Sequence, residues 1–182
     1  MSLLDTRKQV CCKWKYDLKK YPNFPWLKEP SIIAISWFRY GQWVDCLQNG
    51  ILKSFQIKIY WFIFHLLEIM LGISIPKSVQ VGGGLRIYHF GNIFIHNKAN
   101  IGNECILRQG VTIGNRYNND DVPSIGDRVE FGAYAQVLGK IVIGNDVKIG
   151  ALSVVLSDVP DGSTVCGVPA KIKKHRNGHC LP

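Results

Sequence analysis

The second half of the chain carries a large apolar residue at almost every sixth position. Starting at Ile95, ten of the eleven positions reached in steps of six are aliphatic or phenylalanine, and Asn119 is the exception. A period of six fits neither an α-helix nor an alternating strand, but it fits a parallel β-helix whose flat faces each take one hexapeptide. Three faces then close one coil, and the apolar side chains stack inward. The hexapeptides between residues 75 and 160 predict about five coils.

Glycine often follows the inward residue of this repeat, and we expect it to permit the tight turns at the corners. These glycines are Gly102, Gly114, Gly126, Gly132, Gly144 and Gly150.

The first half of the chain has a helical pattern instead. Apolar residues from Ile57 to Leu71 recur at steps of three and four, and prolines at 22, 25 and 30 interrupt the pattern. We expect three or four helices between residues 3 and 72, which would cap one open end of the β-helix. The predicted fold is therefore mainly β, with an α-helical region at 1–73, a parallel β-helix at 74–172 and a basic tail at 173–182.

Two interruptions of the repeat are candidate functional positions. An earlier run with the same step, which ends at Ile87, is out of phase by two residues, and the slip between Ile87 and Ile95 contains His89. The second interruption is the polar segment 115–124, which we expect to be a loop pushed out from the prism. It contains Asp120 and Asp121. A polar interruption of a regular scaffold is a common place for a binding or catalytic site.

Charge and composition narrow the possible partners. The chain has 22 Lys and Arg against 13 Asp and Glu, a net charge of +9, yet it shows no interleaved basic and aromatic module that would indicate nucleic-acid binding. The six cysteines have no CxxC pair and no metal-type spacing, so we expect reduced thiols in a cytoplasmic protein. The apolar run Ile59–Leu67 is too short to span a bilayer. A buried helix is the preferred interpretation, and peripheral membrane contact beside Lys53 and Lys58 is the alternative.

The repeat resembles the hexapeptide-repeat acyltransferases, and within them it is most similar to serine acetyltransferase and to the capsule and exopolysaccharide O-acetyltransferases of the same branch. The matching segments are LRIYHFGNIFI, ILRQGVTIGN, IGDRVEFGAYAQVLGKIVIGNDVKIGALSVVL and GVPAKI. The resemblance implies a left-handed coil, a homotrimer or dimer of trimers, and acetyl-CoA bound in a groove between neighbouring prisms. It implies no metal.

His89 matches the catalytic histidine of that family. The implied role is that of a general base, which takes the proton of an acceptor hydroxyl while its oxygen attacks the thioester. A backbone N–H in the groove would stabilise the oxyanion. In serine acetyltransferase two carboxylates and a second histidine serve this histidine and the amino acid. Here Ser74, Tyr88 and Val122 stand at the corresponding positions. Ser74 and the loop aspartates remain candidates for acceptor binding, and one of those aspartates could also orient His89.

Further candidates surround the implied groove. Arg108 could meet a charged acceptor, although a solvated corner explains it equally well. The resemblance places the pantetheine arm beside small residues, at Gly114, Ala133 and Ala151. Basic residues, Lys148 and Lys171 in particular, could contact the phosphates of CoA.

The missing carboxylates and second histidine favour a sugar hydroxyl of a surface-polysaccharide precursor as acceptor. Serine O-acetylation in cysteine biosynthesis is the alternative within the family. Outside enzymology, the chain could be a non-catalytic structural partner of another acyltransferase. A zinc enzyme of the same fold would need three convergent histidines, which the five histidines of the chain do not supply at suitable positions.

Overall fold

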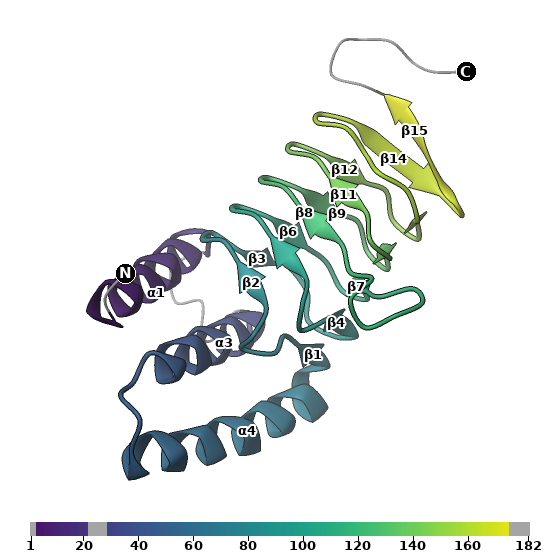
Figure 1. Ribbon diagram of the computed structural model, residues 1–182. Helices are drawn as coiled ribbons and strands as arrows, with labels where there is room; N and C mark the ends of the chain where they lie inside the picture. Colours follow the sequence, from purple (N-terminus) through teal and green to yellow (C-terminus); the bar gives the residue numbers. More distant parts are fainter. Residues whose placement is uncertain (1–2, 22–28, 175–182) are drawn as a thin grey trace.

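The chain folds into a triangular parallel β-helix with helices packed at its N-terminal end (Figure 1). The computed structural model describes residues 3–21 and 29–174. The proline-rich connection at 22–28 and the end of the basic tail, residues 175–182, lie outside the described part. Three sheets run along the prism, here called faces A, B and C, and successive strands visit them in turn. The helices are α1 (Leu3–Lys19), α3 (Ser31–Asp45) and α4 (Ile51–Leu71).

Each face is a ladder of very short parallel strands, one from each coil. Face A holds β1 (Ile73–Ser74), β4 (Ile93–Ile95), β7 (Thr112–Gly114), β10 (Gln136–Leu138) and β13 (Val154–Val155). Face B holds β2 (Gln80–Val81), β5 (Asn100–Ile101), β8 (Ser124–Ile125) and β11 (Val142–Ile143). Face C holds β3 (Arg86–Ile87), β6 (Ile106–Leu107), β9 (Glu130–Phe131), β12 (Lys148–Ile149), β14 (Thr164–Gly167) and β15 (Ala170–Lys174).

The inward positions confirm the six-residue repeat. All ten apolar residues counted from Ile95 to Val155 are buried, and they form one continuous core with the first coil. Asn119 lies instead in the exposed segment between β7 and β8, which leaves the prism as predicted. Stacked inward aliphatic residues therefore hold the coils together, each contributing about 1.5–3 kcal/mol through burial.

The glycines that follow the inward residues do not make the turns, so that expectation is wrong. At Gly102, a Cβ atom would lie 2.4 Å from the carbonyl oxygen of Gly126 on the next coil, and at Gly132 it would lie 2.4 Å from the nitrogen of Ala151. Glycine is needed because the backbones of successive coils approach closely there. The turn itself falls two residues later, where non-glycine residues such as Glu104 and Tyr134 adopt positive φ angles of 57° and 59°.

Both ends of the prism are covered. At the C-terminal end, β15 pairs antiparallel with β14 and forms a hairpin on face C. At the other end, Ile32, Ile35 and Phe38 of α3 join the core of the first coil. A buried ion pair adds to this contact: Arg39 Nε donates to Asp17 Oδ2 at 2.7 Å, and Asp17 Oδ1 accepts the N–H of Leu85 at 2.9 Å. The helical region is therefore anchored to the β-helix by packing and by charge.

Helix α4 contradicts the expectation of a buried helix. Only Tyr60 and Phe64 are buried, and they pack toward α3, where Gly41 lets the ring of Tyr60 approach closely. The helix ends at Gly72, which has a left-handed φ of 61° and whose N–H donates to Glu68. At 21 residues, α4 is much longer than the nine-residue run, and it is the one helix in the described chain that is long and apolar enough to cross a membrane by length and composition alone.

Candidate active site

The slip in the repeat is a two-residue insertion at the corner between faces C and A. Along this corner, backbone hydrogen bonds connect each coil to the next. The carbonyl of Gly91 accepts the N–H of Gly110, the carbonyl of Gln109 accepts the N–H of Tyr134, and the carbonyl of Ala133 accepts the N–H of Leu152. Gly91, Gln109, Ala133 and Ala151 are thus equivalent positions in successive coils. One residue separates Leu107 from Gln109, whereas three separate Ile87 from Gly91.

The insertion pushes three large side chains outward. Tyr88, His89 and Phe90 are all exposed, although Ile87 before them is fully buried. No hydrogen bond to the imidazole of His89 comes from any other residue in the described ranges. The structure therefore presents His89 at the prism surface with both ring nitrogens available to a bound molecule.

An open hollow of about 290 Å³ lies on face C beside this corner. Four of the candidate residues line it: Arg108, Ala133, Lys148 and Ala151. The two alanines hold the position that Gln109 occupies one coil earlier, and their small side chains leave the groove open there. The structure thus brings most of the expected cofactor positions together.

A second hollow, of about 230 Å³, adjoins the first on the same face, since both are lined by Ile106 and Glu130. It extends toward Tyr88, the residue next to His89. The guanidinium of Arg108 lies 5.6 Å from the centre of the Tyr88 ring, and that of Arg86 lies 4.7 Å from it. Two guanidinium groups therefore lie near the ring of Tyr88, the residue next to His89.

The charges near the groove are only partly neutralised. Arg86 is largely buried and donates to Glu29 Oε1 at 2.7 Å, whereas Arg108 is exposed and, within the described chain, contacts only the ring of Tyr88. Lys148 lies 3.4 Å from Glu130 Oε1, and both side chains are well exposed, so this pair is weak. Arg108 is the cation most available to an anionic ligand.

Other candidates lie elsewhere in the single chain. Asp120 and Asp121 sit in the loop between β7 and β8, at the corner between faces A and B, and cannot reach His89 of the same chain. Asp121 Oδ2 accepts the N–H of Tyr117 at 3.2 Å and Oδ1 accepts that of Lys140, so it shapes the loop. Asp120 pairs with Lys98, whose ammonium holds the pKa of that carboxyl below its ordinary value.

Gly114 also lies at the corner between faces A and B, at the end of β7, where its carbonyl accepts the N–H of Gly139. Ser74 lies on β1, opposite Phe94 of β4, and forms no hydrogen bond with His89 in the described part of the chain. Lys171 is exposed on the terminal hairpin and does not line the hollow. These positions stand at different corners or different coils of the prism, so they do not meet His89 within a single chain.

The sequence pattern left two residues unnoticed, Glu130 in the depression and Gln109 at the neighbouring corner. Glu130 is the outward neighbour of Phe131 and stands in register with Ile106 and Lys148, so the repeat itself could have identified it. Gln109 could not be found this way. Its Oε1 atom is buried and has no hydrogen-bond partner among the described residues, which only the structure reveals.

Comparisons with known proteins agree with this architecture. The family model described as bacterial transferase hexapeptide (six repeats) matches residues 123–157. A serine acetyltransferase of Helicobacter pylori is 43% identical over 109 residues, which are 59% of this chain and 64% of that protein. The serine acetyltransferase of Escherichia coli K12 is 33% identical over 141 residues, which are 76% of this chain and 49% of that protein. The chain thus spans less than two thirds of the length of these curated relatives.

The solved structures extend the likeness into the helical region. The crystal structure of Neisseria gonorrhoeae serine acetyltransferase in complex with serine superposes with a TM-score of 0.77 at 31% identity, and it covers 91% of this chain and 69% of the other. The serine acetyltransferase of Brucella abortus strain S19 gives a TM-score of 0.78 at 26% identity over 98% of this chain.

Proposed function

The chain belongs to the hexapeptide-repeat transferases, in their serine acetyltransferase-like branch, and from this premise we propose that it is an O-acetyltransferase that uses acetyl-CoA. Its fold is the left-handed parallel β-helix that the sequence resemblance implied. The observation that carries the proposal is the position of His89. It projects from the insertion at the corner whose later coils present Ala133 and Ala151 to an open groove.

In the proposed reaction, the imidazole of His89 takes the proton from the acceptor hydroxyl as its oxygen attacks the thioester carbonyl. The tetrahedral intermediate collapses and expels the CoA thiolate, which receives the proton back from the imidazolium. The products are the acetyl ester and free CoA. The chain needs to supply only the base and the alignment of the two substrates.

The groove on face C suits the pantetheine arm of acetyl-CoA. Ala133 and Ala151 leave room along it. Arg108 and Lys148 supply cations for the phosphates at the exposed side. We assign Lys171 no contact in the single chain.

We propose a trimer as the working unit, because the candidate residues stand at two different corners of each prism. Gly114, Asp120 and Asp121 occupy the corner between faces A and B, whereas His89 and the alanines occupy the corner between faces C and A. If one corner of a prism meets the other corner of its neighbour, the two sets combine. Such a head-to-tail contact gives a closed oligomer when its rotation closes into a ring, and a ring of three is the assembly that the family resemblance implies.

We take L-serine as the first acceptor to test, since the curated relatives described above are named serine acetyltransferases. The comparisons lend no support to the expectation of a surface-polysaccharide precursor. One observation still favours a second acceptor class. The exposed Arg108 lies over the ring of Tyr88, where serine acetyltransferase has a carboxylate, and a guanidinium beside an aromatic ring suits a sugar phosphate or nucleotide sugar. We propose a cytoplasmic location, as expected from six cysteines with no CxxC pair and no metal-type spacing.

The test is acetyl transfer from labelled acetyl-CoA to L-serine and to a panel of nucleotide sugars, with wild type and His89→Ala. The variant should lower kcat by about a hundredfold or more and leave the affinity for CoA unchanged. His65→Ala is the matched control, because His65 lies on α4, outside both hollows, and should retain full activity. A fully active His89→Ala would exclude His89 as the base, and a wild-type protein that acetylates no hydroxyl would overturn the proposed activity.

A further inference from the structure

The outward face of α4 is apolar along its whole length. The residues pointing away from Tyr60 and Phe64 are the exposed ones, and they include Ile51, Phe62 and Ile69 with exposed fractions of 93%, 74% and 83%. Leu52, Phe55, Leu66 and Met70 extend the same surface. A helix on a water-exposed surface normally carries polar residues on this side. Figure 1 shows α4 at the outer edge of the helical layer, at the end of the molecule away from the terminal hairpin.

The flank of α4 continues into a layer of aromatic side chains. Trp61 contacts Tyr60 with ring centres 5.3 Å apart, and Tyr60 stacks on Trp37 of α3 at 6.1 Å. The series continues through Tyr40, 4.7 Å from Trp37, to Trp43. Tryptophan and tyrosine have apolar bodies with polar tips and are enriched where a membrane meets water.

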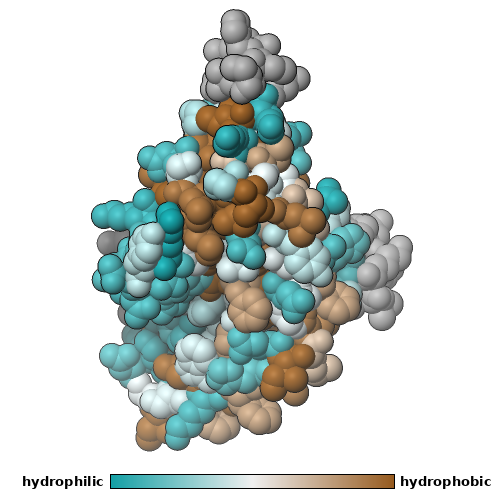
Figure 2. Space-filling view, turned by 90° about the vertical axis from the view of Figure 1, so that its right-hand side faces the viewer, coloured by the Kyte–Doolittle hydropathy of each residue, from teal (hydrophilic) through white to brown (hydrophobic). Residues whose placement is uncertain are grey.

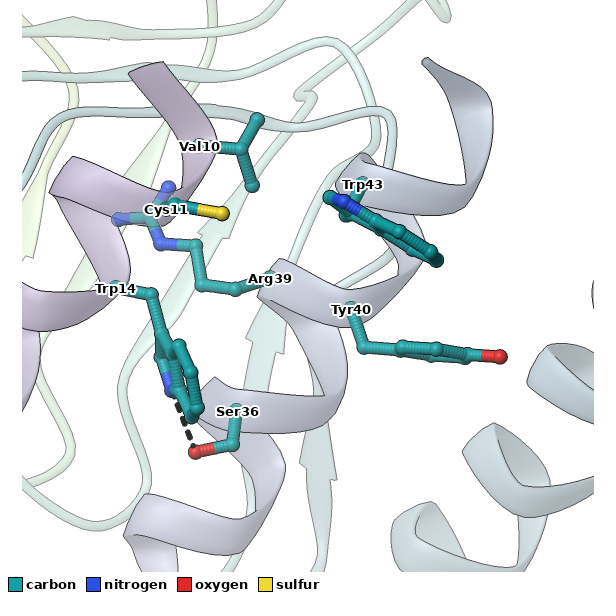
Figure 3. A pocket seen from close by; sticks show the side chains of 7 residues that line it. All are labelled: Val10, Cys11, Trp14, Ser36, Arg39, Tyr40 and Trp43. Atoms are coloured by element: carbon teal, nitrogen blue, oxygen red, sulfur yellow. Dashed lines mark hydrogen bonds between the residues drawn. The ribbon is translucent and has the colours of Figure 1, made fainter. Parts of the chain in front are cut away.

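This aromatic series ends at an apolar pocket of about 340 Å³ between α1 and α3. Figure 3 shows Tyr40 and Trp43 projecting from α3, with Trp14 of α1 opposite them, where its Nε1 donates to Ser36 Oγ at 3.0 Å. The walls are almost wholly carbon, so the pocket suits a hydrocarbon chain and not a polar metabolite. Apolar surface therefore extends from α4 across the helical layer.

The charge of this region complements an anionic surface. Residues 1–73 contain ten Lys and Arg against five Asp and Glu. Lys58 is exposed on α4 beside the apolar face, a position from which its ammonium can reach lipid phosphates. Lysine at the border of an apolar face, with phenylalanine and leucine within it, is typical of helices that lie in the membrane interface.

We propose that α4 docks the protein flat on an anionic membrane, with its apolar face among the upper acyl chains and its aromatic flank at the headgroups. A transmembrane arrangement does not fit. Lys53 near the start of α4 binds the carbonyls of Asp45 and Leu47 at the end of α3, and the residue after Gly72 enters β1, so both ends belong to one folded body.

An anionic bilayer fits this face better than a second copy of the chain does. The helical region carries ten Lys and Arg against five Asp and Glu, so two copies of it would bring like charges together, whereas anionic lipids attract this charge.

The test is co-sedimentation with vesicles of phosphatidylcholine and phosphatidylglycerol, compared with vesicles of phosphatidylcholine alone. The wild type should bind the anionic vesicles more strongly, and added salt should weaken the binding. Phe62→Glu should reduce the partition about tenfold or more, because it places a carboxylate among the acyl chains. Val142→Glu on β11 is the matched control, since Val142 is equally an exposed apolar residue but belongs to the prism. It should bind as the wild type does.

A second readout uses the tryptophans, all five of which lie within the first 73 residues. Lipids brominated on their acyl chains should quench the wild-type fluorescence, and Trp61→Phe should lose much of that quenching. Binding that is absent, or unchanged in Phe62→Glu, would overturn the proposal. A lower molecular mass of Phe62→Glu in light scattering, without vesicle binding by the wild type, would assign the face to self-association instead.

Discussion

The buried pair between Asp17 and Arg39 offers a direct test of how the helical region is anchored. Asp17 is 0% exposed and Arg39 2% exposed, and the guanidinium also donates to the carbonyls of Val81 and Gly82 in the first coil. Asp17→Ala removes the carboxylate, leaves the guanidinium buried without a counter-charge, and takes the acceptor from the N–H of Leu85.

The expected cost follows from these contacts. Breaking a buried ion pair by removing one partner costs about 3–5 kcal/mol of the free energy of unfolding. Arg39 keeps its bonds to two backbone carbonyls, so we expect the lower part of this range for Asp17→Ala, about 3 kcal/mol. Asp17→Asn keeps an acceptor oxygen and should cost less, about 2 kcal/mol, the value of a hydrogen bond to a charged group.

The assay is urea unfolding followed by circular dichroism, with Asp146→Asn as the matched control. Asp146 also binds an arginine through two hydrogen bonds, to Arg128 Nε at 2.7 Å and to its Nη2 at 3.0 Å, but this pair lies at the surface. Its loss should cost less than about 1 kcal/mol. The reasoning would be refuted if Asp17→Ala stayed within about 1 kcal/mol of the wild type, or if the exposed pair cost as much as the buried one.

Three further predictions concern the groove, a thiol and a surface carboxylate. Ala151→Leu should raise the KM for acetyl-CoA about tenfold with little change in kcat, because the larger side chain fills the groove without touching the base; steady-state kinetics checks this, and an unchanged KM would place the cofactor elsewhere. Burial raises the pKa of Cys105 to about 11, so iodoacetamide at mildly alkaline pH should modify the exposed Cys11 and spare Cys105 in the folded protein, as mass spectrometry of peptides will show. The hydrogen bond from the ammonium of Lys20 lowers the pKa of Glu104 below 4.5. The carboxylate of Glu104 therefore stabilises the fold above pH 4.5, and this contribution is lost as the pH falls through the pKa of the folded state. The free energies of unfolding of wild type and Glu104→Gln should differ above pH 4.5 and converge below the pKa of the folded state.

The β-helix was predictable from the sequence because its coils repeat the same physical requirement. Each face needs one large inward side chain, and a fixed face length spaces these residues by six. The same regularity made the interruptions visible, both the insertion with His89 and the loop with Asp121. The insertion is real, because three residues stand between Ile87 and Gly91 where a later coil has one.

The sequence pattern could not show which surfaces of the folded chain are in contact with one another. A glycine after each inward residue suggests a turn or a close approach equally well, and only the distances at Gly102 and Gly132 decide for close approach. Helix α4 was misjudged for a similar reason. Apolar residues cover both of its faces, so the pattern shows that the helix is apolar without showing which face α3 covers. The contacts of Tyr60 settle that question in the structure.

The position of His89 depends on the number of residues that join face C to the next corner of the coil. In the later coils, one residue joins face C to the stacked corner position, and the side chains at this position are small at Ala133 and Ala151. The groove stays open for that reason. Two extra residues at the first such corner give the chain the length to turn Tyr88, His89 and Phe90 outward while Ile87 and Ile93 stay in the core. Figure 2 shows one side of the molecule, on which hydrophobic side chains gather in the upper part of the view with hydrophilic ones beside them. One corner of the prism thus supplies both a reactive side chain and a groove for its co-substrate. The coil with the insertion projects His89 outward, and the next coils, which lack the insertion, leave an open groove beside Ala133 and Ala151.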